Sequence, residues 1–410
     1  MKKEKKIMTG LELEPVTLKK GYKQTKLGVI PEDWKVNLIG DIYIFKNGLN
    51  KEKKYFGFGT PIINYMDVNK LPFVNKNNIK GKVSLNESEK KRFNILKGDV
   101  FFTRTSETIN EIALSTVLTE DIDGGVFSGF VLRARPINDK IDIEYAKYCF
   151  LTQIVRNEIK SKSSFTTRAL TNGRFLSEVN ILIPPKPQQI KIAKILSTWD
   201  AAINKQTQLI QAKQQQKKAL MQLLLTGKKR FDGFTEVWKE VRLGEVAIKN
   251  SSSLSANSLS NNKGDFKVYG AIGFLKRIDF YNEEDKYISI VKDGAGVGRT
   301  LLCDAKSSVL GTLDVIKPKE NIDLYFLYLV LKMINFLKYI IGSTIPHIYF
   351  KDYSTYKIKL PTLKEQKKIA QVLSKSDQEI TLLKEQLAQF QQQKQGLMQV
   401  LLTGKVLVSV

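Results

Sequence analysis

A long stretch of this chain occurs twice, and that repeat constrains the fold more than any other feature. The first copy runs from Pro184 to Lys228 and reads PPKPQQIKIAKILSTWDAAINKQTQLIQAKQQQKKALMQLLLTGK. The second runs from Pro361 to Lys405 and reads PTLKEQKKIAQVLSKSDQEITLLKEQLAQFQQQKQGLMQVLLTGK. The register has no gaps, because each position of the second copy lies 177 residues after its equivalent in the first. A repeat of this length predicts a duplicated architecture.

Both copies also have the periodicity of a coiled coil. Seam positions recur at alternating steps of four and three, which is the a/d pattern of a heptad repeat. The apolar helix-pairing positions predicted in the first copy are Ile192, Leu196, Trp199, Ile203, Ile210, Leu220 and Leu224. Those of the second copy are Ile369, Leu373, Ile380, Leu383, Leu387, Phe390, Leu397 and Leu401. Polar residues continue the same spacing at Gln206, Lys213, Lys217, Ser376 and Lys394.

Helix start and stop signals frame each copy. Proline precedes it and Thr-Gly ends it, as at many helix termini. A helix of about 40 residues, rising about 1.5 Å per residue, would be about 60 Å long. Neither seam can bury itself, so the simplest partner of one helix is the other. The alternative is a pair of unrelated core helices that look alike by chance.

The repeat extends beyond the helices. KLGVIPEDWKVNLIGDI precedes the first globular region and FDGFTEVWKEVRLGEV precedes the second. Trp34 and Trp238 correspond, as do Gly40 and Gly244, each pair being 204 positions apart. The chain therefore alternates globule, helix, globule, helix.

Both globules are predicted to be β-rich. Short β-branched and aromatic runs lie between Gly, Asn and Asp residues. We expect strands in segments 99–104, 126–133, 287–292 and 308–316. Each globule is expected to end with one helical segment, at 144–162 and 324–341, followed by a polar tip at 163–174 and 343–351. A strand then leads into the proline of each long helix.

The charge of the chain points to a polyanionic partner. Lys and Arg total 66 against 41 Asp and Glu, a formal charge of +25, which favours nucleic acid first and an anionic membrane second. No apolar run approaches the roughly 20 residues that span a bilayer. The Lys-rich start lacks the apolar region of a secretory signal. Cys149 and Cys303 lie far apart without a CxxC motif, so a reducing cytoplasm is expected.

The sequence offers little chemistry for catalysis. Its single histidine, His347, provides no pair for a metal and no nucleophile–base arrangement. A strand followed by Gly294, Gly296 and Gly298 resembles the nucleotide loop of a methyltransferase. However, a helix should follow such a loop, and the next residues read as extended. The favoured interpretation is a Gly-rich turn in a β-rich domain.

Recognition is the remaining role. The globules carry Lys, Arg, Asn, Ser and Thr in Gly-punctuated loops, and these side chains hold phosphates and contact base edges. The DNA-binding candidates of the first globule are Lys46, Asn47, Arg104, Thr105, Ser106, Thr166, Thr167, Arg168, Asn172 and Arg174. Those of the second are Arg277, Lys292, Arg299, Ser343, Thr344, His347 and Lys351. The alternative for any one of them is a solvated surface role.

The repeated motif resembles the specificity subunit of type I restriction–modification systems. That family has Pro, then Gln and Ile-Ala, then Leu-Ser and an Asp at fixed spacing. The first copy matches at Pro184, Gln189, Ile192, Ala193, Leu196 and Asp200. The second matches at Pro361, Gln366, Ile369, Ala370, Leu373 and Asp377. LGVIPEDWKVNLIGDI and both LLTGK endings add to a resemblance that covers essentially the whole chain.

The resemblance implies an α+β fold in which two β-rich target-recognition domains are joined by two long antiparallel coiled-coil helices, with an internal pseudo-two-fold repeat. The implied segments are a basic N-terminal arm 1–20, target-recognition domain 1 at 21–183, a central conserved helix 184–228, target-recognition domain 2 at 229–360, a C-terminal conserved helix 361–405 and a tail 406–410.

The resemblance also implies the function. Each recognition domain reads one half of a split sequence in double-stranded DNA, and the helices set the unread spacer and dock two modification subunits. This chain has no catalytic role, no metal and no bound cofactor. S-adenosylmethionine is expected on the modification subunits, and ATP and Mg²⁺ on restriction subunits. The alternatives are a stand-alone DNA adenine methyltransferase and a coiled-coil scaffold that binds DNA without sequence preference.

Overall fold

The computed structural model describes residues 20–70 and 72–409, so the basic arm predicted at 1–20 lies, except for Lys20, outside the described residues. The chain forms two compact units. Unit 1 contains the chain up to Asn204 together with the part from Ala388 onward, and unit 2 contains Lys205–Leu387. Each unit therefore holds one globule and about half of each long helix.

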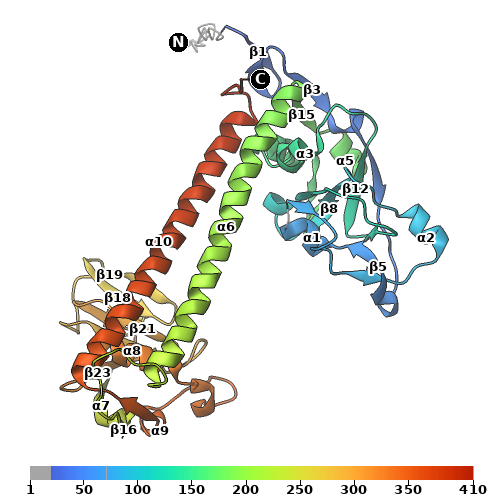
Figure 1. Cartoon of the computed structure of the whole chain (residues 1–410). Helices are drawn as coiled ribbons and strands as arrows, with labels where there is room; N and C mark the ends of the chain where they lie inside the picture. Colours follow the sequence, from blue (N-terminus) through green and yellow to red (C-terminus); the bar gives the residue numbers. More distant parts are fainter. Residues whose placement is uncertain (1–19, 71, 410) are drawn as a thin grey trace, which may run out of the picture. The chain divides into compact units, whose positions relative to one another are not determined.

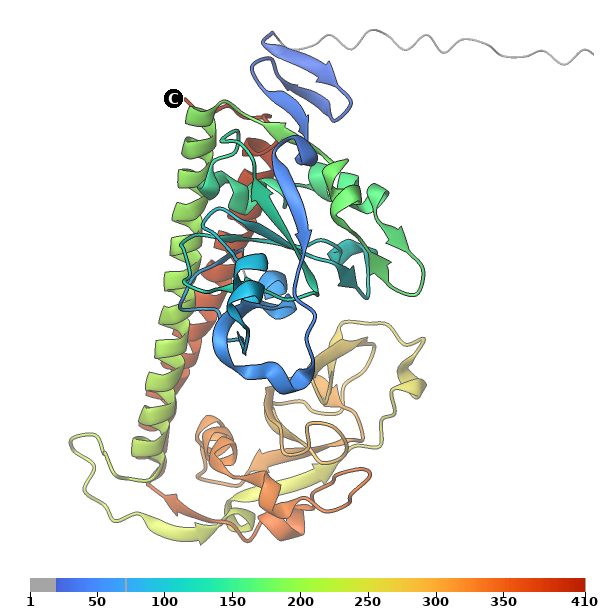
Figure 2. The ribbon, with the colours of Figure 1, turned by 90° about the vertical axis from the view of Figure 1, so that its right-hand side faces the viewer.

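The two repeated segments form the two longest helices (Figures 1 and 2). Helix α6 spans Lys186–Leu225, 40 residues, and α10 spans Leu363–Leu401, 39 residues. In unit 1 the rings of Trp199 and Phe390 lie 5.9 Å apart, edge to face. In unit 2 the amide of Gln206 donates to the carbonyl of Leu383 at 2.9 Å.

Ion pairs between α6 and α10 show that these helices run antiparallel. Asp200 pairs with Lys394 at 2.5 Å within unit 1, whereas Lys217 pairs with Asp377 at 2.5 Å within unit 2. Position numbers thus rise along α6 as those of their partners fall along α10.

The predicted seam is the buried side of both helices. Its fully buried apolar members are Ile192, Leu196, Ile210, Leu224, Ile369, Leu373, Ile380 and Leu401. Its half-buried members are Trp199, Ile203, Leu220, Leu383, Leu387, Phe390 and Leu397. The predicted fold class, an α+β chain with two β-rich globules and a duplicated pair of long antiparallel helices, is confirmed.

The Thr-Gly endings close both helices in the same way. Gly227 and Gly404 adopt φ values of 70° and 72°, a left-handed conformation that glycine adopts without a Cβ penalty. After Gly227, the N–H of Lys229 bonds the carbonyl of Leu223 at 3.1 Å, and the equivalent bond follows Gly404. The N–H of Gly227 also bonds the carbonyl of Leu224 at 3.3 Å, and that of Gly404 the carbonyl of Leu401 at 3.4 Å. Together these bonds satisfy carbonyl groups that the helix end leaves without intrahelical partners.

The first globule is built on a five-stranded sheet of order β4-β12-β8-β10-β6. Smaller sheets have the orders β11-β5-β7, β13-β14-β9, β15-β3 and β1-β2. The strands are β1 (Tyr22–Thr25), β2 (Gly28–Pro31), β3 (Lys35–Leu38), β4 (Tyr43–Asn47), β5 (Phe56–Ile63), β6 (Phe73–Val74), β7 (Lys82–Val83), β8 (Val100–Thr103), β9 (Thr105–Ser106), β10 (Ser115–Leu118), β11 (Val126–Phe127), β12 (Val131–Pro136), β13 (Ser164–Phe165), β14 (Ala169–Leu170) and β15 (Asn180–Ile183). The helices are α1 (Tyr65–Lys70), α2 (Glu87–Arg92), α3 (Ile143–Cys149), α4 (Gln153–Lys162) and α5 (Gly173–Ser177).

The second globule is smaller and follows the same plan. Its sheets have the orders β17-β23-β20-β21, β19-β18-β22 and β16-β24. The strands are β16 (Lys239–Arg242), β17 (Ala247–Ser251), β18 (Phe266–Gly270), β19 (Gly273–Ile278), β20 (Tyr287–Val291), β21 (Thr300–Cys303), β22 (Ser307–Val309), β23 (Leu313–Pro318) and β24 (Lys357–Leu360). The helices are α7 (Leu243–Val246), α8 (Leu324–Met333) and α9 (Phe350–Tyr353).

The single helices predicted at the end of each globule are wrong. Segment 144–162 forms α3 and α4, because the hydroxyl of Thr152 caps a new helix by accepting from Val155 N–H. Segment 324–341 forms α8 and a separate 3₁₀ turn, where Asn335 provides the cap. The strands predicted at 126–133 and 308–316 are each divided in two by a turn.

Candidate nucleic-acid interface

A buried glutamine anchors each globule to the start of its long helix. Gln189 donates to the carbonyls of Lys140 and Pro184, both at 2.8 Å, and accepts from Asp142 N–H at 2.8 Å. Its repeat equivalent Gln366 makes the corresponding three bonds at 3.3, 3.0 and 2.9 Å. The glutamine of the repeated motif thus bonds main-chain atoms only.

A tryptophan completes each junction, and it is buried at Trp34 and half-buried at Trp238. The indole N–H of Trp34 donates to Gln188 at 2.8 Å, and that of Trp238 donates to Glu365 at 2.9 Å. Because Glu365 lies 177 positions after Gln188, the two junctions use equivalent positions. We call these junctions, together with α6 and α10, the frame.

In the first globule, a three-stranded sheet brings several DNA-binding candidates together. Strand β9, which is Thr105–Ser106, pairs with β14, which pairs with β13. The exposed turn between β13 and β14 contains Thr166, Thr167 and Arg168. Arg104 precedes β9 and donates to the carbonyl of Gly129 at 3.0 Å. We call this surface tip 1.

Not all candidates in this globule are free to contact DNA. Ser106 is buried, and the side chain of Asn172 caps α5. Arg168 pairs with Glu107 at 3.0 Å on the surface. Asn47 and Arg174 are exposed, and Asn47 lies at the end of β4, which α5 contacts.

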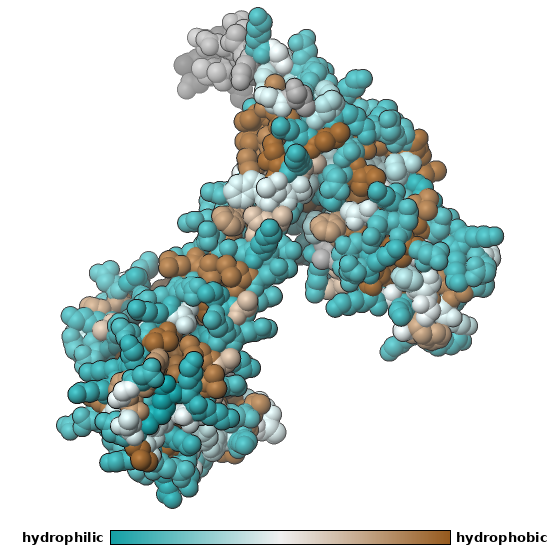
Figure 3. Space-filling view, in the orientation of Figure 1, coloured by the Kyte–Doolittle hydropathy of each residue, from teal (hydrophilic) through white to brown (hydrophobic). Residues whose placement is uncertain are grey.

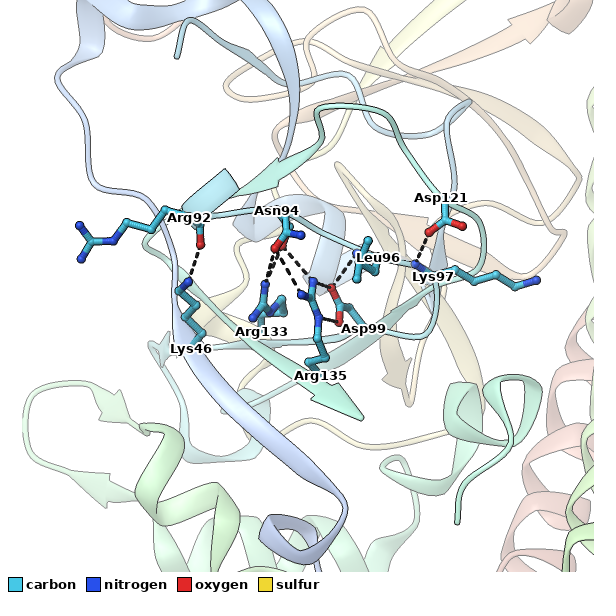
Figure 4. A network of polar contacts seen from close by, with 9 residues as sticks. All are labelled: Lys46, Arg92, Asn94, Leu96, Lys97, Asp99, Asp121, Arg133 and Arg135. Atoms are coloured by element: carbon cyan, nitrogen blue, oxygen red, sulfur yellow. Dashed lines mark hydrogen bonds and ion pairs between the residues drawn. The ribbon is translucent and has the colours of Figure 1, made fainter. Parts of the chain in front are cut away.

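Lys46 belongs to a polar network rather than to tip 1 (Figure 4). Its ammonium group donates to the carbonyl of Arg92. Arg135 grips Asp99 with two bonds of 2.8 and 2.7 Å, and Arg133 donates to the carbonyl of Asn94 at 2.6 Å. The pKa of Lys46 is lowered mainly by burial and, to a smaller extent, by the positive charges of the nearby arginines. The network fastens loop 92–99 to the sheet, a structural role that the sequence did not indicate.

The second globule gathers its candidates around the Gly-rich turn. Gly294 N–H donates to Pro346 carbonyl at 2.9 Å, and Ile348 N–H donates to Lys292 carbonyl at 2.9 Å. These bonds join the turn to the tip predicted at 343–351. We call the joined surface tip 2; it brings together the candidates Lys292, Arg299, Ser343, Thr344, His347 and Lys351.

Tip 2 contains both exposed and partnered side chains. Ser343, Thr344 and Lys351 are exposed. Lys292 lies 3.4 Å from the buried carboxylate of Asp314. The ring of His347 packs edge-on against Tyr349 at 5.0 Å. Outside tip 2, Arg277 lies on β19 and donates to the carbonyl of Asp265.

The Gly-rich turn is a β-turn region and not a nucleotide loop. Gly294, Gly296 and Gly298 all have positive φ. At Gly298 a Cβ would lie 2.5 Å from the side chain of Phe336, so only glycine fits. Strand β21 follows where a nucleotide loop requires a helix.

Exposed apolar side chains accompany both tips, and the sequence reasoning missed them. Phe130 and Phe165 of the first globule are 68% and 56% exposed, and Ile345 of tip 2 is 63% exposed. Apolar side chains contact thymine methyl groups in the major groove. The sequence did contain one sign of such a side chain, because Phe165 is an aromatic residue within the polar segment 163–174. Over the face shown in Figure 3, the surface is mainly hydrophilic with scattered apolar groups.

Residues 20–70 and 72–409, which the structure describes, lack features of two other kinds of protein. In that part of the chain no helix is long and apolar enough to cross a membrane. The same residues contain no group of three or more His, Cys, Asp or Glu side chains placed to hold a metal ion.

The fold and these surfaces define a class of protein: a duplicated helical frame that carries two basic, β-rich globules with dissimilar tips. The family described as type I restriction modification DNA specificity domain matches this chain twice, over residues 31–214 and 235–392. The chain belongs to that family, as the repeated motif predicted.

Known relatives match along nearly their whole length. The chain is 28% identical to the putative type I restriction enzyme MjaX specificity subunit of Methanocaldococcus jannaschii, over 94% of this chain and 97% of that protein. It is 24% identical to the MjaVIII specificity subunit of the same organism, over 92% and 94%. The solved type I restriction-modification S subunit from M. genitalium has a TM-score of 0.59 at 18% identity, covering 90% of this chain and 96% of that one.

Proposed function

We propose that this chain reads a bipartite DNA target for a type I restriction–modification complex, with one globule on each half-site. The observation that carries the proposal is the contrast between the two parts of the repeat. The frame repeats in one register without a gap, whereas tip 1 and tip 2 differ in sequence and in structure. A repeated support with dissimilar tips suits two sites of one kind with different specificities.

The two halves of the frame make equivalent polar contacts with the partners exchanged. Asp200 of α6 pairs with Lys394 of α10, and Asp377 of α10 pairs with Lys217 of α6. Such an exchange of equivalent partners is the mark of an isologous contact. A DNA duplex has two-fold symmetry of its own, so a duplicated support suits a target made of two half-sites.

We further propose that the long helices set the unread spacer between the half-sites. Separations between half-sites are typically about one DNA turn, or about 34 Å. A helix of this length has ample reach for such a role, since each of its residues adds about 1.5 Å.

The frame also offers two equivalent surfaces for two copies of one partner. A cavity of about 400 Å³ beside the first junction is lined by Lys35, Pro184 and Gln189. Their repeat equivalents help to line a cavity of about 380 Å³ beside the second junction. We propose that each surface contributes to the docking of one modification subunit. We also propose that S-adenosylmethionine, ATP and Mg²⁺ are bound by partner subunits and that the complex works in the cytoplasm.

The test is to produce the chain with its modification subunit and to map methylated adenines by long-read sequencing. A bipartite motif with a fixed unread gap is the expected result. Methylation at one continuous motif would contradict the assignment of one globule to each half-site. Binding that falls with salt but shows no sequence preference would favour the non-specific scaffold, and methyl transfer by the chain alone would favour the stand-alone enzyme.

A further inference from the structure

A single carboxylate in unit 1 connects three helices. Asp200 of α6 accepts a hydrogen bond of 2.7 Å from the hydroxyl of Tyr148, which belongs to α3 of the first globule. The same carboxylate pairs with Lys394 of α10 at 2.5 Å. The ammonium group of Lys394 also lies 5.4 Å from the centre of the Tyr148 ring. The globule and both long helices therefore meet at one point.

Unit 2 contains the same arrangement. Asp377 of α10 accepts from the hydroxyl of Tyr325, which belongs to α8 of the second globule, and pairs with Lys217 of α6 at 2.5 Å. All three residues lie 177 positions from their counterparts in unit 1. The lysine side chains are only 14% and 17% exposed, so each loses much of its hydration and depends on its partners.

The tyrosines occupy different positions in the helices that supply them. Asp142 and Asp323 are the equivalent N-caps of α3 and α8, because each donates its N–H to the frame glutamine of its unit. Tyr148 lies six residues after its cap, whereas Tyr325 lies two residues after its cap. Two different packings thus bring a phenol to the same aspartate, which indicates that the contact itself is needed.

We propose that these two Tyr–Asp–Lys sets are register clamps, which restrict the complex to one spacer length. The proposal rests on the proposed function, in which the helices set the spacer. An apolar heptad seam also fits when one helix slides by a heptad, which is about 10.5 Å. Such a slide would separate both Lys–Asp pairs and leave half-buried charges without partners. The tyrosines fasten each recognition domain to the register so defined.

A nearby ion pair provides a matched control. Lys213 of α6 pairs with Glu379 of α10 at 2.6 Å, so it also joins the two helices. The positions equivalent to Lys213 and Glu379 are Phe390 and Ala202, which cannot repeat the pair. Its side chains are also more exposed, at 32% and 48%. Lys213→Met therefore removes an interhelical charge pair without touching a clamp.

The experiment uses the full chain assembled with its modification subunit and a duplex library that keeps both half-sites and varies the gap. The native complex is expected to methylate only duplexes with one particular gap length. The double variant Lys217→Met and Lys394→Met should methylate neighbouring gaps at about tenfold higher relative rates, with both half-sites unchanged. Tyr148→Phe with Tyr325→Phe should act in the same direction, and Lys213→Met should behave as the native chain.

The proposal would be overturned if the clamp variants assemble and show the same relative methylation rates across gap lengths as the native complex. Loss of methylation at every gap from an assembled complex would also overturn it, because the sets would then be needed for activity as such and not for the choice of gap. If the lysine variants do not fold, the tyrosine variants decide, since they remove only two hydroxyl groups. Failure of the proposed function is a separate result, because the native complex itself would then show no bipartite target.

Discussion

Replacement of Gln189 by alanine should weaken unit 1 through the loss of three main-chain contacts. Gln189 is 1% exposed and bonds two carbonyls and one N–H, each at 2.8 Å. Truncation leaves these three buried groups without their partner, and each loss is worth about 1 kcal/mol. Water entering from the adjacent cavity can replace part of the loss. We therefore expect unit 1 to lose about 2–3 kcal/mol of unfolding free energy.

The assay is urea denaturation followed by tryptophan fluorescence. Two of the three tryptophans, Trp34 and Trp199, lie in unit 1, so the signal reports mainly on that unit. In a unit of this size, about 2–3 kcal/mol corresponds to a fall in melting temperature of about 4–12 °C.

The matched control is Gln211→Ala, which truncates an exposed glutamine on the same helix. It should change the unfolding free energy by less than about 0.5 kcal/mol. If Gln189→Ala were no more destabilising than Gln211→Ala, the proposed role of the glutamine as an anchor would be refuted.

Three further predictions concern the frame. Insertion of one heptad after Asn204, with another after Leu387, keeps every contact within each unit and adds about 10.5 Å, so methylation mapping should show a spacer longer by about three base pairs with both half-sites retained. An unchanged spacer would contradict the proposal that the long helices set its length. The pKa of both Tyr148 and Tyr325 is raised above the ordinary value of 10.0. Burial is the larger cause for both tyrosines, and the hydrogen bond to an aspartate is the second. Their protonated forms stabilise the fold fully below about pH 10, and this stability is lost as the pH rises further. Urea midpoints at about pH 9 and pH 11 should therefore differ less in the double Phe variant than in the native chain; an equal difference would refute this. Residues 1–230 should pair with a second copy and read a palindrome, which the modification subunit then methylates. A monomer that shows no DNA preference in the presence of the modification subunit would contradict this.

The frame was predictable because its pattern is local and doubled. Heptad spacing specifies a buried stripe on a helix without knowledge of the rest of the chain, and the burial of Ile192, Leu196, Ile369 and Leu373 follows that stripe. The helix ends were likewise encoded locally, in the Thr-Gly pairs.

The tips were less predictable because tertiary contacts form them. Thr105 and Ser106 form a strand only by pairing with Ala169–Leu170. No pattern in the sequence near Thr105 predicts that this segment is the partner. Thr152 reads as an ordinary residue within a helical pattern, yet it caps a new helix. The roles of Ser106 and Asn172 depend in the same way on burial and on backbone groups nearby.

The anchoring glutamines have a consequence for the evolution of such a chain. Gln189 and Gln366 hold their globules through the carbonyls and N–H groups of the backbone, and every amino-acid sequence supplies these groups. A globule can therefore accumulate substitutions, or be exchanged by recombination for one of another lineage, without loss of its attachment. Novel specificities can arise by shuffling ready-made modules onto an inherited framework, provided that each newcomer presents its backbone to the glutamine and a phenol to the aspartate.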